Sequence, residues 1–183
     1  ELEHHASMQI KRRFQTDVDA GKITIIDDDY LQQNHVYTLF QAHVRENRIL
    51  YGAGDLGEVY AIALSQTVGI YALVTDDTKL GGPHASLIRF PDTDIMPFTY
   101  VEVMLLNFLE GKLEANEVIQ IVAQVNAASD MNWQLPGQLK KFICRFWKQP
   151  YQQREKDWMR DFCKTRNILA QHKLAELMCF FRK

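Results

Sequence analysis

One short apolar run, Ile70–Thr75 (IYALVT), constrains the fold of this chain more than any other feature. It follows Gly69, which interrupts a helical pattern, and Asp76 and Asp77 come directly after it. A near-continuous apolar run is typical of a parallel strand that is buried on both faces. Because helical patterns lie on either side of the run, we expect an α/β fold with a central parallel sheet.

Local signals predict the other elements. We expect a second strand at the β-branched segment Lys22–Ile26, just after Gly21 ends the first helix. Thr99 and Glu102 have the spacing of a capping box at the start of another helix. Helices are expected over residues 9–20, 30–48, 58–68, 99–110 and from 116 onward, with further helices after Pro136 and Gly137.

Composition excludes several classes of protein. With 183 residues, 46% of them hydrophobic, the chain has enough apolar material for a folded core. No run approaches the roughly 18 apolar residues of a membrane-spanning helix. Three scattered cysteines without a CxxC pair favour neither a disulfide framework nor a zinc site, so we expect a reduced, cytoplasmic protein. Residues 1–7 (ELEHHAS) are typical of a tag remnant and are set aside.

Charge divides the chain into an acidic body and a basic end. Residues 1–135 carry a net charge of −10 and residues 136–183 one of +8. We therefore expect an α/β domain over residues 8–135 and a basic helical extension over residues 136–183, whose charge either binds RNA or complements the acidic body. The candidate nucleic-acid-binding residues are Lys140, Lys141, Arg145, Lys148, Arg154, Lys156, Arg160 and Arg166.

The aromatic residues of the basic extension allow two interpretations. Trp147, Trp158, Phe180 and Phe181 either pack on the body or anchor a protein partner. Core packing is the favoured role, because large aromatic side chains at helical spacing usually face a core.

Four acidic residues form the candidate site. Asp55 and Glu58 stand three apart at a helix start, while Asp76 and Asp77 follow a strand, at the edge where parallel sheets bind ligands. Converging carboxylates of this kind suit Mg²⁺ or Mn²⁺. The same spacing also fits a helix cap by Asp55 and Glu58, and both interpretations stay open.

Two other sites have less support. Gly52, Gly54 and Gly57 give a GxGxxG pattern, but a very short strand precedes it and acidic residues occupy the loop. His84 has no evident serine or cysteine partner for a hydrolytic triad.

Three segments together resemble the second half of a PIN domain. They are Gly54–Ser65 (GDLGEVYAIALS), Leu73–Asp77 (LVTDD) and Phe98–Leu105 (FTYVEVML), and the resemblance spans roughly residues 10–128. It implies a PIN-like three-layer sandwich and a ribonuclease that depends on Mg²⁺ or Mn²⁺. Such enzymes are often bacterial toxins, so the resemblance implies an antitoxin partner as well as RNA.

The resemblance assigns roles to the four acidic residues. Glu58 and Asp77 match the family's catalytic acids, and Asp55 and Asp76 complete the metal ligands that remain. The opening strand of the family, with its own acidic residues, has no counterpart before Ile26. The domain is therefore expected to be incomplete at its N-terminal side, with an open sheet edge that a homodimer or a strand swap between copies would cover. The alternative function is an inactive PIN-like module that binds nucleic acid or protein.

Overall fold

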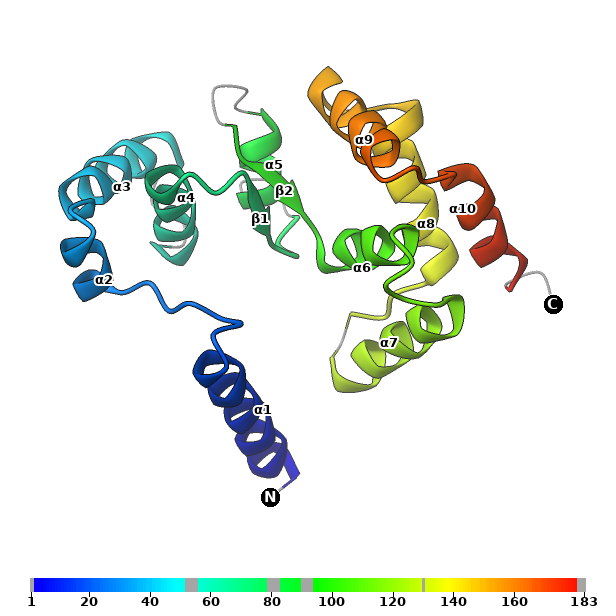
Figure 1. Ribbon diagram of the computed structural model, residues 1–183, viewed down its shortest axis with the longest axis horizontal. Helices are drawn as coiled ribbons and strands as arrows, with labels where there is room; N and C mark the ends of the chain where they lie inside the picture. Colours follow the sequence, from blue (N-terminus) through cyan, green and yellow to red (C-terminus); the bar gives the residue numbers. More distant parts are fainter. Residues whose placement is uncertain (1, 52–55, 79–82, 90–93, 130, 181–183) are drawn as a thin grey trace.

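The computed structural model describes residues 2–51, 56–78, 83–89, 94–129 and 131–180. Helices dominate these residues, and they contain two short strands (Figure 1). The expected PIN-like three-layer sandwich with a central parallel sheet is therefore wrong. A sheet of two strands cannot form the middle layer of a sandwich, and most of the described core lies between helices instead.

The elements follow one another along the chain with short connections. The N-terminal part contains the helices α1 (Leu2–Asp19), α2 (Asp28–Gln33), α3 (Tyr37–Tyr51) and α4 (Leu56–Val68). The middle part contains the strand β1 (Ala72–Val74), the helix α5 (Pro83–Arg89) and the strand β2 (Met96–Phe98). The C-terminal part contains α6 (Tyr100–Leu109), α7 (Ala115–Ala128), α8 (Leu135–Ile143), the π-helical turn η1 (Cys144–Lys148), α9 (Gln153–Thr165) and α10 (Ala170–Cys179).

The two strands run parallel, with Leu73 of β1 opposite Pro97 of β2. The apolar run did predict a parallel strand, but burial on both faces is wrong. All three residues of β2 are buried, whereas Ala72 and Val74 of β1 are exposed. Ala72 and Val74 point to the same face of the sheet, and no described element buries that face. Leu73 points to the other face, where it packs against the cluster of Ile62, Leu87 and Ile95.

The main hydrophobic core packs β2 and α6 against the C-terminal helices. Its largest fully buried side chains include Leu105, Leu109, Phe142, Phe146 and Met159. The core joins residues on both sides of the domain boundary that we expected at residue 135, and this boundary falls at the start of α8. A smaller cluster joins α2, α3 and α4.

Several local predictions are confirmed. Thr99 and Glu102 form a reciprocal capping box at the start of α6. Gly21, Gly69 and Gly111 follow their helices with positive φ angles, a conformation that favours glycine. Trp147 and Trp158 pack against the main core, as the core interpretation expects, whereas Phe180 is 44% exposed and Phe181 lies outside the described residues.

Two local predictions are wrong. The segment Lys22–Ile26 is not a strand, because no described segment pairs with it. The helix expected over residues 30–48 is two helices, α2 and α3. His35 separates them with a φ of 59°, a conformation that an α-helix cannot contain.

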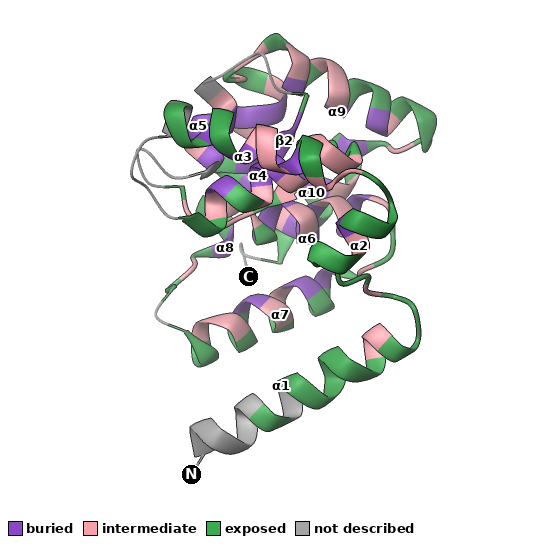
Figure 2. Cartoon of the chain, turned by 90° about the vertical axis from the view of Figure 1, so that its left-hand side faces the viewer, coloured by how far each residue is buried: buried purple, intermediate pink, exposed green. Residues whose placement is uncertain are grey.

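The first helix lies apart from the rest of the chain, and its described side chains are mostly exposed (Figure 2). No helix within the described ranges is long and apolar enough to cross a lipid bilayer.

Candidate functional site

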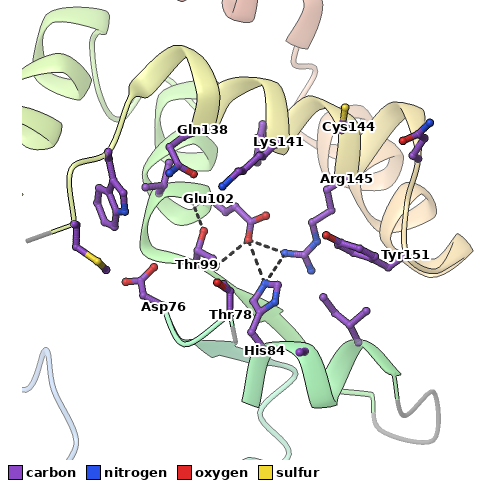
Figure 3. Close-up of a pocket in the computed structure, with 17 residues that line it drawn as sticks. Asp76, Thr78, His84, Thr99, Glu102, Gln138, Lys141, Cys144, Arg145 and Tyr151 are labelled. Atoms are coloured by element: carbon purple, nitrogen blue, oxygen red, sulfur yellow. Dashed lines mark hydrogen bonds and ion pairs between the residues drawn. The ribbon is translucent and has the colours of Figure 1, made fainter. Parts of the chain in front are cut away.

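A pocket of about 970 Å³ opens where both strands end. Asp76 and Thr78 reach it from the end of β1, and Thr99 reaches it from the end of β2 (Figure 3). The opposite wall is α8 with η1, from which Lys141 extends into the pocket. Parallel sheets commonly bind ligands at the carboxyl ends of their strands, so the edge that we expected to carry the site is also the edge that carries the pocket.

Buried ionic groups form the floor of the pocket. The Arg145 guanidinium is 4% exposed and lies between two carboxylates. Its Nη1 donates to Glu102 Oε2 at 2.6 Å, and its Nε donates to Glu155 Oε1 at 2.9 Å. Its Nη2 donates to the carbonyl oxygen of Pro97 at 2.8 Å. One positive group thus connects η1 to α6, α9 and β2, and the planar guanidinium suits this geometry better than a lysine would.

Each carboxylate also caps a helix. Glu102 Oε2 accepts the backbone N–H of Thr99 at 2.9 Å, which closes the capping box of α6. Glu155 Oε2 accepts the backbone N–H groups of Tyr151 and Gln152 at the start of α9. The negative charges therefore lie at the positive ends of two helix dipoles, which adds to their stabilisation by Arg145.

His84, at the start of α5, completes this group. Its Nε2 lies 3.3 Å from Arg145 Nη1 and 4.0 Å from Glu102 Oε2. Its Nε2 thus faces both the guanidinium and the Glu102 carboxylate, and the tautomer of the ring decides whether Nε2 accepts from the first or donates to the second.

The pKa of Glu102 is lowered despite burial. Burial alone would raise the pKa, because it disfavours the charged carboxylate. His84, the charge of Arg145 and the backbone N–H of Thr99 together outweigh burial, and the net shift is downward. Glu102 therefore stays ionised in the folded protein at neutral pH.

The structure places three of the four predicted acidic residues. Asp76 lines the pocket, and its Oδ1 accepts the N–H of Tyr100 at 3.0 Å. Asp77 is half-buried beside it, and Glu58 is half-buried in the first turn of α4. Asp55 lies outside the described residues. Within the described ranges, no three His, Cys, Asp or Glu side chains are grouped to hold a metal ion, so the metal site stays a prediction.

The predicted nucleic-acid-binding residues fall into two groups. The arginines have partners within the fold. Arg145 is buried as described, Arg160 pairs with Asp157, Arg166 pairs with Glu110, and Arg154 donates to the carbonyl oxygen of Leu87. The four lysines are exposed, and within the described ranges none of them forms an ion pair; they are Lys140, Lys141, Lys148 and Lys156.

Sequence reasoning missed two aromatic residues of the pocket. Tyr151 is 67% exposed at one end of it, and Trp133 lines it and stacks on Tyr100 with ring centroids 6.1 Å apart. Neither residue has a motif around it. The buried role of Arg145 did have a signal, because it interrupts the apolar run from Phe142 to Trp147, where an unpaired charge would be costly.

No protein-family model, no curated protein and no solved structure matches this chain. The similarity to PIN domains therefore stays a prediction from the three sequence segments, and the site has to be interpreted from its own chemistry.

Replacing Arg145 tests the ionic group. We expect Arg145→Ala to lower the free energy of unfolding by about 3–5 kcal/mol, because it leaves two buried carboxylates without their cation. Urea unfolding followed by circular dichroism measures this. The control is Arg160→Ala, which removes an exposed arginine from its pairs with Asp157 and Asp161 and should cost at most about 1 kcal/mol. Equal losses in the two variants would contradict the role of Arg145.

Acid should weaken the fold through Glu102. A carboxylate with a lowered pKa contributes stability that is complete above its unfolded pKa of about 4.5. That contribution is lost as the pH falls through the lower folded value. We expect the melting temperature of the wild type to fall more steeply below pH 4.5 than that of Glu102→Gln. The exposed residue Glu176 supplies the control, since Glu176→Gln should keep the wild-type slope.

Proposed function

We propose that the pocket binds single-stranded RNA, with one unpaired base inside and the phosphate backbone along α8 and η1. The observation that carries the proposal is the combination of Lys141 with two aromatic residues, Trp133 and Tyr151, around one pocket. Proteins that bind single strands combine aromatic rings that stack on bases with cations that follow the backbone. This is the binding-module alternative of the sequence analysis, without the PIN-like fold.

The exposed cation of the pocket supports an anionic ligand. Arg145 offsets one of the two carboxylate charges in the floor, and Asp76 accepts the N–H of Tyr100. Lys141 has neither kind of partner among the described residues, so its charge is available to a ligand. The exposed Lys140 and Lys148 extend the positive surface from the pocket along the same helical segment.

The size and polar lining of the pocket suit a nucleotide. A volume of about 970 Å³ lies at the upper end of the range for small-molecule sites. Thr78, Thr99 and Gln138 line the walls, and their hydroxyl and amide groups can both donate and accept hydrogen bonds. A base within a duplex could not enter, so the proposal requires an unpaired strand. A cytoplasmic location, as we expect from the cysteines, would give access to such RNA.

Lys141 provides the test of phosphate contact. We expect a fluorescent single-stranded RNA to bind with a dissociation constant that rises with salt. In Lys141→Ala the slope of log Kd against log salt should fall by about 0.7, the value for one phosphate contact with a single strand. Fluorescence anisotropy at several salt concentrations measures this. Lys11→Ala, a change on the separate helix α1, should leave the slope unchanged (Figure 1).

Tyr151 provides the test of stacking. Its side chain is exposed, and its backbone N–H, which donates to Glu155 at the start of α9, remains in any variant. We expect Tyr151→Ala to weaken binding by about 1–3 kcal/mol, which is roughly 5- to 150-fold, because one base loses its aromatic partner. Tyr151→Phe keeps the ring and should bind like the wild type. Equal affinity of all three proteins, or preference for duplex RNA, would contradict the proposal.

The same experiment separates binding from the cleavage that the sequence predicts. Binding through lysines and aromatic rings requires no divalent metal, so it should persist in EDTA. Cleavage by the predicted acids would require Mn²⁺ and would be lost in Asp77→Asn or Glu58→Gln. If the wild type shortens the RNA in Mn²⁺ and neither variant does, the protein is a nuclease. If the RNA stays intact and bound, the binding module is favoured.

A further inference from the structure

The two outer edges of the small sheet differ in the backbone hydrogen-bonding groups that they leave available. The backbone groups of Tyr71 and Thr75 form hydrogen bonds with β2. Because hydrogen bonding alternates along a parallel strand, Ala72 and Val74 direct their N–H and C=O groups to the outer edge of β1. On the outer edge of β2, Pro97 has no N–H, and its carbonyl oxygen accepts from Arg145. The β2 edge is therefore closed, and the β1 edge is the one that can accept another strand.

The β1 edge is open among the residues that the structure describes. None of them bonds to the outward N–H or C=O groups of Ala72 and Val74. The apolar side chains along this edge are exposed, namely those of Ile70, Tyr71 and Val74 at 41%, 70% and 54%. An exposed apolar strand edge is a template for pairing with another chain, and proteins normally cover such edges or protect them with charge.

The segment Ile23–Ile26 resembles a strand in composition and is partly exposed. No segment that the structure describes pairs with it, and Ile25 is 53% exposed. The segment is held at both ends. Ile23 N–H donates to the carbonyl oxygen of Asp17 in α1, and Ile26 packs against the cluster of α2, α3 and α4. Its middle therefore faces solvent, where it can meet the β1 edge of another molecule without rearrangement.

Charge selects the direction of pairing. Asp76 and Asp77 follow β1, while Lys22 precedes the segment and Asp27 follows it, with two further aspartates after that. Parallel pairing would place the two acidic clusters side by side. Antiparallel pairing places Lys22 beside the aspartates of β1 and separates the acidic clusters, which is the more favourable arrangement.

We propose that Ile23–Ile26 of one copy of this chain adds as an antiparallel strand to the β1 edge of a second copy. A two-fold arrangement makes the exchange reciprocal, because each copy supplies one segment and one edge. The dimer then contains two three-stranded sheets, and both apolar edges are covered. The proposal does not depend on RNA binding, because the β1 edge lies on the opposite side of the sheet from Pro97 and Arg145.

Light scattering coupled to size exclusion tests the dimer. The wild type should have twice the 21.3 kDa mass of the chain and dissociate on dilution. Val74→Lys and Ile25→Lys should each shift the protein to the monomer, because a lysine on a strand edge opposes pairing. Ile49→Lys is the matched control, since Ile49 is 83% exposed on α3, and it should stay dimeric. A wild type that is monomeric at all concentrations would overturn the proposal.

Cysteine cross-linking tests which segments meet. Thr24→Cys and Val74→Cys are prepared as separate proteins in a background without Cys144, Cys163 and Cys179. Mild oxidation of the mixture should give a disulfide-linked species of twice the chain mass, in greater yield than either protein alone. A third protein carries both substitutions in one chain. If it forms an internal disulfide at high dilution, the segment pairs with β1 of its own chain, and the proposal fails. Circular dichroism checks that each variant keeps its helices.

Discussion

The Arg145 guanidinium connects elements that lie far apart in the sequence. From η1 it contacts the capping carboxylate of α6, the capping carboxylate of α9, the carbonyl oxygen of Pro97 in β2 and the imidazole of α5. It also lies over the ring of Phe146, 4.8 Å from its centroid. A buried ionic group contributes less net stability than its attraction suggests, since all its members lose water. Its larger effect is to fix geometry, because few arrangements satisfy every donor and acceptor at once.

This geometry explains how so small a sheet persists. Two strands alone are marginally stable in water and need packing against other elements. Here β2 is fixed by the main core on its faces and by Arg145 at its outer edge. The first strand depends on β2 and on contacts with α4, which leaves its other edge exposed. The stability of the sheet thus comes from the helical side, and the same asymmetry leaves β1 as a surface for association.

The sequence predicted the local features that depend on a few neighbouring residues. It failed for the features that depend on contacts with residues far away in the chain. The capping box at Thr99 and the glycine that ends α6 require a few adjacent residues, and both predictions are confirmed. The strand expected at Lys22–Ile26 requires a partner strand, and its β-branched composition could not supply one. For the same reason the apolar run before Asp76 indicated the strand and the edge of the sheet that carries the pocket, but not the number of strands beside it. Tyr151 reaches the pocket through tertiary packing, which no local pattern records.

The basic C-terminal segment illustrates why net charge is a coarse guide to function. Arg145 and Arg154 turn inward, where a planar group with several donors can satisfy buried carboxylates and carbonyl oxygens. Arg160 and Arg166 instead form ion pairs at exposed positions, and Lys140, Lys141, Lys148 and Lys156 remain in solvent. The net charge of the segment therefore combines charge that stabilises the fold with charge that can meet a ligand. Substitution of a lysine along α8 and η1 changes the surface potential without disturbing the ionic floor of the pocket, whereas substitution of Arg145 alters both.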